Sequence, residues 1–326
     1  MPIVESTFYT SKVMRNGHLQ TIYPFLFRKV SSDIFDAERI ELEDGDFIDI
    51  DFYKKGSDDL VIVTHGLEGA SDKPYTRGIS HHLSSAHGFD VIAWNMRSCS
   101  GELNRLKTFY HGAQTDDISS VIKYALEHHP YKRVHIIGFS LGGNLTAYYA
   151  TKVGRREHPQ VFSAVALSAT IDLQSSVLKL GQSNFGKFYS GIFLDTMKKK
   201  VIQKHKLGLI DVSPKEINKC KNFIDFDNLI TAPHLGFKNA SEYYNFASAR
   251  QHIENTEIPI LLIQSKDDPF LSRSCYPVRL AKKNPLVHLE MTISGGHVGF
   301  IQHDKKFHYW AEERVAQFIN GQINAV

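Results

Sequence analysis

Cysteine is scarce in this chain of 326 residues, which holds only Cys99, Cys220 and Cys275, far apart in the sequence. An odd number at such spacing predicts neither a disulfide framework nor a zinc site. No cluster of residues has the spacing of metal ligands, and no glycine-rich dinucleotide fingerprint follows an early strand. We therefore expect no metal and no cofactor, and a reducing, cytoplasmic environment.

Long apolar runs and a large excess of one charge are also missing. No stretch reaches the roughly 18 apolar residues of a membrane-spanning helix, and the first twenty residues lack the apolar stretch of a secretory signal. The net charge of +3 is too small to indicate a nucleic-acid partner. The run Lys198–Lys200 is more typical of a solvated helix face than of a membrane patch. We expect no stable membrane insertion and favour a monomer.

Short apolar runs rich in β-branched residues recur along the chain, and such runs are typical of strands buried on both faces of a parallel sheet. A pair of alternating strands around a glycine-containing turn precedes most of them and indicates a hairpin. The hairpin falls at residues 39–53, and the apolar runs fall at residues 59–66, 89–97, 133–140, 161–169, 259–268 and 287–294.

Helical patterns alternate with these runs, at residues 115–129, 141–154 and 307–321, and Thr115 is a candidate N-cap. The alternation predicts an α/β fold, a mostly parallel central sheet flanked by helices. Residues 171–257 contain no convincing strand and look helical. We therefore expect a helical lid insertion at 171–257 in a core made of residues 1–170 and 258–326.

The stretch GFSLGGN, at residues 138–144, lies where a strand must turn sharply into a helix. Ser140 has Gly138 and Gly142 two residues away on either side, and such small neighbours allow strained backbone angles at the serine. This G-x-S-x-G arrangement is the nucleophile elbow of the α/β-hydrolase fold. It exposes the hydroxyl beside a helix N-terminus, which favours developing negative charge.

A serine hydroxyl needs a base, and the base needs an orienting carboxylate. In this fold they follow in the order serine, carboxylate, histidine. Asp267 and Asp268 end one late strand, and His297 follows two glycines after the last strand. We predict His297 as general base and acid. We favour Asp268 over Asp267 as its partner because Asp268 precedes a proline and is therefore biased to an extended backbone.

A tetrahedral intermediate also needs amide donors for its oxyanion. The backbone N–H of Leu141, directly after the serine, is one candidate. The loop at residues 64–69 follows an early strand, and within it the N–H of Leu67 is the better second donor. We expect His65 to be structural, with its ring bonding within that loop.

Four further stretches resemble the YheT-like branch of the α/β-hydrolases over most of the chain: NGHLQT, HGLEGASDKPY, NMRSCSGELN and FDNLITAPHLGFKNASEYYNFAS. The resemblance implies a hydrolase core with a helical lid, and a triad of Ser140, one aspartate of the 267/268 pair and His297. Relatives are described as carboxylesterases, phospholipases or alcohol acyltransferases. The resemblance therefore implies a reaction class and leaves the substrate open.

Several polar side chains in these stretches are expected to have structural roles. Packing under the lid is favoured over lining a pocket for Asn16, His18 and Gln20. Arg97 is expected to anchor a neighbouring loop through a buried ion pair. The remaining acidic pair, Asp116 and Asp117, is expected to serve a helix N-terminus.

Aromatic and aliphatic residues recur at helical spacing in the lid segment and either pack on the core or also wall an acyl pocket: Phe185, Phe188, Tyr189, Ile192 and Phe193. The segment offers no evident polar recognition group, which favours small apolar esters over peptides or sugars. The sequence thus predicts a serine hydrolase of carboxylic esters that works through an acyl-enzyme. Acyl transfer to an alcohol and a non-catalytic binding protein are the alternatives.

Overall fold

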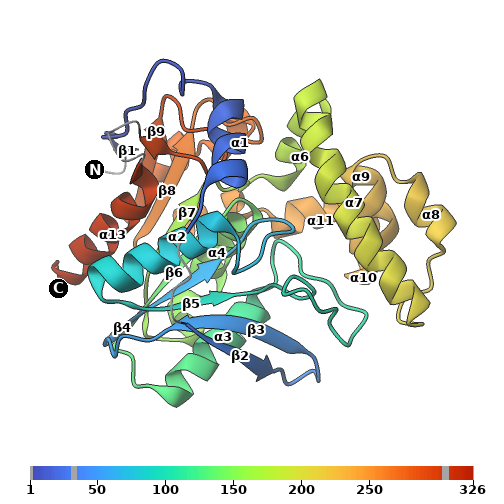
Figure 1. Ribbon diagram of the computed structural model, residues 1–326, viewed down its shortest axis with the longest axis horizontal. Helices are drawn as coiled ribbons and strands as arrows, with labels where there is room; N and C mark the ends of the chain where they lie inside the picture. The colour runs from blue at the N-terminus through green and yellow to red at the C-terminus, as the bar shows by residue number, and fades with distance from the viewer. Residues whose placement is uncertain (1–2, 31–34, 303–307, 326) are drawn as a thin grey trace.

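The computed structural model (Figure 1) describes residues 3–30, 35–302 and 308–325. Nine strands form one sheet in the order β1-β9-β8-β7-β6-β4-β5-β3-β2, and all neighbouring pairs from β1 to β5 are parallel. The strands are β1 Ile3–Val4, β2 Asp36–Glu41, β3 Phe47–Tyr53, β4 Asp59–Thr64, β5 Asp90–Trp94, β6 Arg133–Phe139, β7 Val161–Leu167, β8 Ile260–Ser265 and β9 Val287–Thr292.

The hairpin of β2 and β3 is antiparallel and adds to the sheet through β3 and β5. The predicted α/β-hydrolase fold, its hairpin and its six buried strands are therefore confirmed. Short β1 was not expected, and neither was a separate ribbon of β10 (Ile301–Gln302) with β11 (His308–Tyr309).

Both faces of the sheet are covered, which explains why its strands are apolar at successive positions. Ile62 of β4 belongs to a core with helices α3 (Thr115–His128) and α4 (Leu141–Lys152). Its neighbour Val61 belongs to a second core on the other face, with α2 (Pro74–His81) and α13 (Trp310–Ile323). Because alternate residues of a strand face opposite sides, an uninterrupted apolar run is needed to fill both cores.

Two helices begin at other positions than the sequence predicted. Gln114 occupies the N-cap position of α3, and its side chain makes no cap hydrogen bond. Thr115, the expected cap, is instead the first residue of the helix. The last expected helical stretch began at residue 307, and residues 303–307 lie outside the described part of the chain. Helix α13 begins at Trp310 after the short β11 strand.

Residues 171–257 form helices and turns without a strand, as expected, and lie to one side of the sheet in Figure 1. Helix α7 is the longest, and Ser183 caps its start by accepting from the N–H of Gly186. The elements are α6 Leu173–Gly181, α7 Asn184–Lys206, α8 Pro214–Lys219, α9 Phe223–Phe226, the π-helical turn η2 Asp227–Thr231, α10 Ala232–His234, α11 Ala240–Ala247, and the short turns η3 Ala249–Gln251 and η4 Ile253–Asn255.

The remaining helices lie at the edges of the core. Helix α1 (Gly17–Phe27) crosses the carboxyl-terminal side of the sheet next to the insertion (Figure 1). A π-helical turn, η1 (His82–Ala86), continues α2. Shorter elements are α5 Gly154–Glu157, η5 Arg273–Cys275 and α12 Val278–Ala281.

Candidate active site

Ser140 sits between β6 and α4 in a backbone conformation that residues with side chains rarely adopt, with φ 54° and ψ −117°. Its two glycine neighbours are sterically required. A Cβ on Gly138 would lie 2.1 Å from the carbonyl oxygen of Gly142, and a Cβ on Gly142 would lie 2.1 Å from that of His65. The sharp turn leaves the Ser140 side chain partly exposed at the N-terminus of α4, as the sequence predicted.

His297 lies between Ser140 and Asp268. Its Nε2 is 2.9 Å from the Ser140 Oγ, and its Nδ1 is 2.9 Å from Asp268 Oδ2. The Asp268 carboxylate is buried, and its other oxygen accepts from the N–H of Phe270 at 2.7 Å. Asp267 instead bonds within the loops, accepting from the Ser265 hydroxyl and the Gly296 N–H. The structure thus brings together the three residues favoured by the sequence and leaves Asp267 apart.

Two contacts hold the His297 ring and backbone in place. The ring of Phe270 stacks on the imidazole, with centroids 4.0 Å apart and planes inclined by 15°. The His297 N–H donates to Thr21 Oγ1 of α1 at 2.9 Å. Tyr189 of α7 packs in turn on Phe270, with centroids 5.0 Å apart. The insertion therefore supports the imidazole through one intervening ring.

The loop after β4 passes close to Ser140. A Cβ on Gly66 would lie 3.1 Å from the Ser140 Cβ, so the next backbone amide, that of Leu67, is near the hydroxyl. Within the described part of the chain, the N–H groups of Leu67 and Leu141 donate no hydrogen bond. Both amides are thus available to an oxyanion, in keeping with the prediction for them.

His65 shapes this loop, as predicted. Its Nε2 accepts from the Met96 N–H at 3.0 Å, so the proton is on Nδ1, which donates to the Gly66 carbonyl at 2.7 Å. Complete burial lowers the pKa of His65 to about 4, and the ring is therefore neutral near pH 7. Tyr75 of α2 accepts from the Gly66 N–H at 2.9 Å and fixes the other side of the turn.

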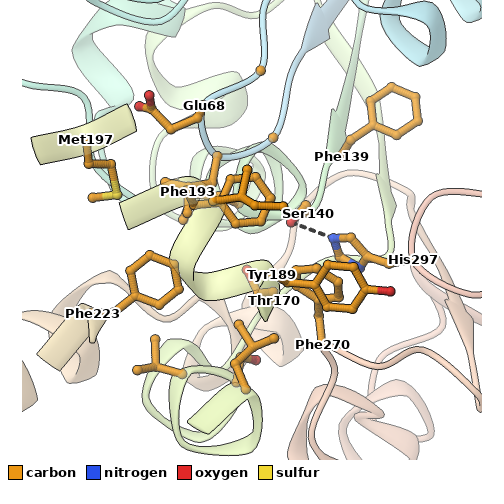
Figure 2. Close-up of a pocket in the computed structure, with 18 of the residues that line it drawn as sticks. Glu68, Phe139, Ser140, Thr170, Tyr189, Phe193, Met197, Phe223, Phe270 and His297 are labelled. Atoms are coloured by element: carbon orange, nitrogen blue, oxygen red, sulfur yellow. Dashed lines mark hydrogen bonds between the residues drawn. The ribbon is translucent and has the colours of Figure 1, made fainter. Parts of the chain in front are cut away.

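A cavity of about 630 Å³ reaches Ser140 and His297 and extends beneath the insertion. Figure 2 shows Ser140 and His297 on one side, with Met197 and Phe223 of the insertion further away. Most lining side chains are apolar, and α7 contributes four of the five residues singled out in the sequence: Phe188, Tyr189, Ile192 and Phe193. Phe185 instead packs against His18 of α1, with ring centroids 4.4 Å apart. The apolar face of α7 therefore lines the cavity in addition to packing.

Residues 59–304 match the family model described as alpha/beta hydrolase fold. The chain belongs to this family. The α/β hydrolase is 30% identical to a protein named "Putative esterase YheT" of Escherichia coli K12, over 98% of this chain and 94% of that one. The resemblance to YheT-like proteins is thereby confirmed.

A second relative of this α/β hydrolase is the medium-chain fatty acid ethyl ester synthase/esterase 2 of Saccharomyces cerevisiae. The two are 28% identical over 79% of this chain and 61% of the relative. Among solved structures, the Pyrococcus furiosus esterase Pf2001 is similar with a TM-score of 0.59 at 18% identity, covering 90% of this chain and 97% of that one. This structural likeness shows the fold.

The position of Lys200 in the α/β hydrolase differs from the expectation that Lys198–Lys200 form a solvated helix face. Lys199 is exposed, but the Lys200 ammonium points inward and lies 2.9 Å from the carboxylate of Glu68. Glu68 follows Leu67, has a φ of 52° and also accepts from the Tyr110 hydroxyl at 2.7 Å. The lysine run is therefore not wholly a solvated face, because its last member joins α7 to the loop beside Ser140.

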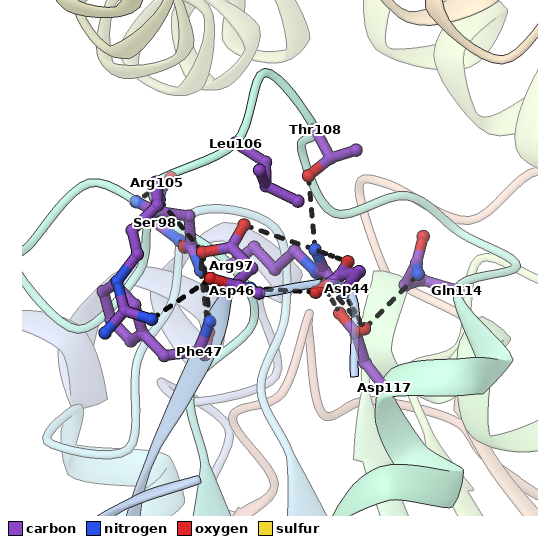
Figure 3. A network of polar contacts seen from close by, with 12 residues as sticks. Asp44, Asp46, Phe47, Arg97, Ser98, Arg105, Leu106, Thr108, Gln114 and Asp117 are labelled. Atoms are coloured by element: carbon purple, nitrogen blue, oxygen red, sulfur yellow. Dashed lines mark hydrogen bonds and ion pairs between the residues drawn. The ribbon is translucent and has the colours of Figure 1, made fainter. Parts of the chain in front are cut away.

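Arg97 forms the buried ion pair expected for it (Figure 3). Its guanidinium donates to both oxygens of Asp117, with contacts of 2.8 and 3.0 Å, and to Asp44 at 2.7 Å. The sequence predicted that Asp117 acts only as a negative charge at the start of α3. Its carboxylate instead forms an ion pair with Arg97. Asp116 stays exposed in the first turn of that helix.

Asn16, His18 and Gln20 of the NGHLQT stretch do not line the cavity, although Thr21 of the same stretch does. Asn16 caps α1 by accepting from the Leu19 N–H, and the buried Gln20 side chain exchanges hydrogen bonds with the backbone of Ile301. His18 Nδ1 lies 3.0 Å from the Tyr189 hydroxyl of α7. Packing against the helical insertion is therefore confirmed for His18, whereas Gln20 is buried against the backbone of Ile301 and Asn16 is an exposed helix cap.

A polar patch in the cavity was missed at the sequence level, where no polar recognition group was expected. Asp227 of η2 lines the cavity, and its carboxylate accepts from the hydroxyls of Thr231 and Tyr244. Burial raises the pKa of Asp227 to about 6. The only available signal was an aspartate inside the distinctive lid stretch, because its partners are set by how η2 and α11 pack.

Proposed function

We propose that this α/β hydrolase is a serine esterase that cleaves carboxylic esters with apolar acyl groups. Ser140 acts as nucleophile, His297 as general base and acid, and Asp268 as the carboxylate that orients the imidazole. The observation that carries the proposal is the pair of 2.9 Å contacts of His297, one to the Ser140 hydroxyl and one to the Asp268 carboxylate. Relatives named as an esterase and an ester synthase/esterase support the same class.

The reaction follows from these positions. Ser140 Oγ attacks the ester carbonyl carbon while His297 Nε2 takes the hydroxyl proton, and the Asp268 carboxylate stabilises the imidazolium. The N–H groups of Leu67 and Leu141 bind the oxyanion, assisted by the N-terminus of α4. When the intermediate collapses, His297 returns the proton to the departing alcohol, and the acyl group remains on Ser140. Water then attacks with the same base and releases the acid.

The shape and chemistry of the cavity support apolar acyl groups. Its volume of about 630 Å³ is within the usual range for small-molecule sites, which are mostly apolar with a few fixed polar groups. Side chains from α6, α7 and α9 provide the apolar walls, among them Leu180, Met197 and Phe223. A chain of several methylenes fits this space better than an acetyl group does.

Acyl transfer to an alcohol is the second candidate, and the synthase/esterase relative favours it. The same acyl-enzyme forms, and an alcohol replaces water in the second step. Incubation with an octanoyl ester and added ethanol distinguishes the two, because transfer yields ethyl octanoate whereas hydrolysis yields octanoate alone.

A fluorophosphonate probe tests the nucleophile directly. Wild-type protein should be labelled, whereas Ser140→Ala and His297→Ala should lose labelling and hydrolysis of p-nitrophenyl esters. Ser120→Ala, which changes a serine on α3 away from the cavity, is the matched control and should behave as wild type. A folded wild type that neither takes the label nor cleaves small esters would reject the enzyme and favour a binding protein.

A further inference from the structure

The large apolar side chains that are exposed in the described part of the chain are strongly clustered. Nine of the twelve belong to two segments, residues 6–30 and 174–200. These nine are Tyr9, Val13, Phe25, Leu26, Phe27, Leu178, Phe185, Phe188 and Ile192. We call them the apolar rim.

The two segments of the rim are in contact around the cavity. His18 of α1 lies against Phe185 of α7 and contacts the Tyr189 hydroxyl. Four rim residues also line the cavity, namely Phe25 and Leu26 from α1 and Phe188 and Ile192 from α7. Part of the rim therefore lies at the cavity that reaches Ser140.

The same segments have a local excess of positive charge. Together they hold nine lysines and arginines and a single acidic residue, Asp195. Two of the nine are already paired, Arg28 with Glu312 and Lys200 with Glu68. The other seven basic residues leave a positive excess, although the whole chain has a net charge of only +3. Exposed aromatic residues next to basic ones are the features that bind an anionic lipid surface.

We propose that the apolar rim docks this protein on an anionic lipid surface, with the cavity mouth facing the lipid. The docking itself needs no catalysis, but its purpose rests on the esterase function proposed above, since an apolar ester would enter the cavity from the lipid. Among the described residues, no helix is long and apolar enough to cross a membrane.

Vesicle co-sedimentation of Ser140→Ala protein tests the docking without turnover. Vesicles of phosphatidylcholine with phosphatidylglycerol should bind the protein, and added salt or vesicles of phosphatidylcholine alone should weaken binding. Val13→Ser with Phe27→Ser should reduce binding by about tenfold or more. Leu207→Ser with Ile293→Ser is the matched control, because these residues are equally exposed but lie outside the rim.

Equal binding of the rim variant and the control variant would overturn the docking proposal, as would no binding of the parent protein. Analytical ultracentrifugation could also find that the parent protein and the control variant are dimers while the rim variant is a monomer. That result would assign the rim to self-association instead. Hydrolysis of a short soluble ester, measured with Ser140 intact, should be unchanged in both variants. Loss of that hydrolysis would signal misfolding, whereas its absence from wild type would concern only the esterase proposal.

Two histidines and a glutamate lie close together away from the cavity. His82 Nε2 and His87 Nε2 lie 3.0 and 3.2 Å from the same oxygen, Glu313 Oε2. The three ligand atoms all lie within 4.8 Å of one another. In a tetrahedral zinc site with bonds of roughly 2.0 to 2.1 Å, neighbouring ligand atoms are about 3.3 Å apart.

The backbone accounts for this arrangement. In an α-helix, residues five apart point in different directions, whereas the π-helical turn η1 widens the coil between His82 and His87. Such turns are rare and frequent at functional sites. Gln317 donates to the other oxygen of Glu313, and no described lysine or arginine forms an ion pair with this carboxylate. The sequence did not predict this cluster, because Glu313 is 231 residues from His82.

We infer that His82, His87 and Glu313 form a site for a divalent transition metal of the zinc class, with water completing the coordination. The metal would join η1 to α13 and is separate from the proposed ester chemistry. Calorimetric titration of tag-free protein with Zn²⁺ should give one equivalent and a raised Tm. His87→Ala and Glu313→Gln should each weaken binding by about tenfold or more, whereas His128→Ala, at an exposed histidine elsewhere, should not. Equal affinity in wild type and a His82→Ala/His87→Ala variant, or no binding by wild type, would overturn the site.

Discussion

The Lys200 ammonium of α7 lies 2.9 Å from the carboxylate of Glu68, in the loop that contributes Leu67 beside Ser140. Both side chains are mostly buried, 17% and 5% exposed. The position of the helical insertion and the path of the loop beside Ser140 are therefore linked by one ion pair.

Removing one partner of this pair should lower the free energy of unfolding more than removing both, because the remaining partner is then a buried charge without a counter-ion. Lys200→Met should lower the free energy of unfolding by about 3 kcal/mol, and Lys200→Met with Glu68→Gln should recover much of the loss. Urea denaturation of the two single variants and the double variant measures the coupling. Additive effects would mean that the pair contributes nothing specific.

Asp268 and Asp267 should differ sharply in activity. Asp268→Asn loses the anion at His297 Nδ1, and kcat should fall by about 10³ to 10⁴. Asp267→Asn retains an oxygen for the Ser265 hydroxyl and the Gly296 N–H, and it should keep most of its activity. Steady-state kinetics on p-nitrophenyl octanoate measures the kcat of both variants. A larger loss of kcat in Asp267→Asn than in Asp268→Asn would assign the triad carboxylate to Asp267.

His65 should make the fold sensitive to acid. Its folded pKa of about 4 lies below the unfolded value of about 6.5, so the unfolded chain binds more protons between these values. Its contribution to stability is present above pH 6.5 and is lost as the pH falls toward 4, by up to about 3 kcal/mol.

Denaturation at several pH values checks this expectation, with His65→Gln showing a shallower decline than wild type between pH 6.5 and 4. His128→Gln, at an exposed histidine, is the control and should follow wild type. Parallel curves for wild type and His65→Gln would show that His65 is not the group responsible.

Acyl-chain selectivity should respond to the far wall of the cavity. Met197→Trp places a larger ring there and should lower kcat/KM for octanoyl esters by about tenfold while sparing acetyl esters. Leu178→Trp is the matched control, because Leu178 is exposed on α6 and does not line the cavity. An equal fall for both chain lengths would mean that the acyl group lies elsewhere.

The sequence predicted the parts of this molecule that depend on local pattern. Buried strands, the turn at Ser140 and the choice of Asp268 all follow from apolar runs, small neighbours and a following proline. Ion pairs between separate segments were not predictable, because the packing of those segments sets which charges come together. The pairs Lys200–Glu68 and Arg97–Asp117 are examples. Asp227 was likewise hidden, since nothing near it in the sequence indicates that it faces a cavity.

Helix α1 carries a consequence for biosynthesis. Thr21 receives the N–H of His297 across 276 residues, and Gln20 binds the backbone of Ile301 across 281. A ribosome makes α1 long before either partner exists, so the buried side of this helix stays uncovered through most of translation. Such distant pairings slow folding and leave apolar surface open to aggregation. A growing chain thus cannot bring His297 and Ser140 together until its last strands emerge.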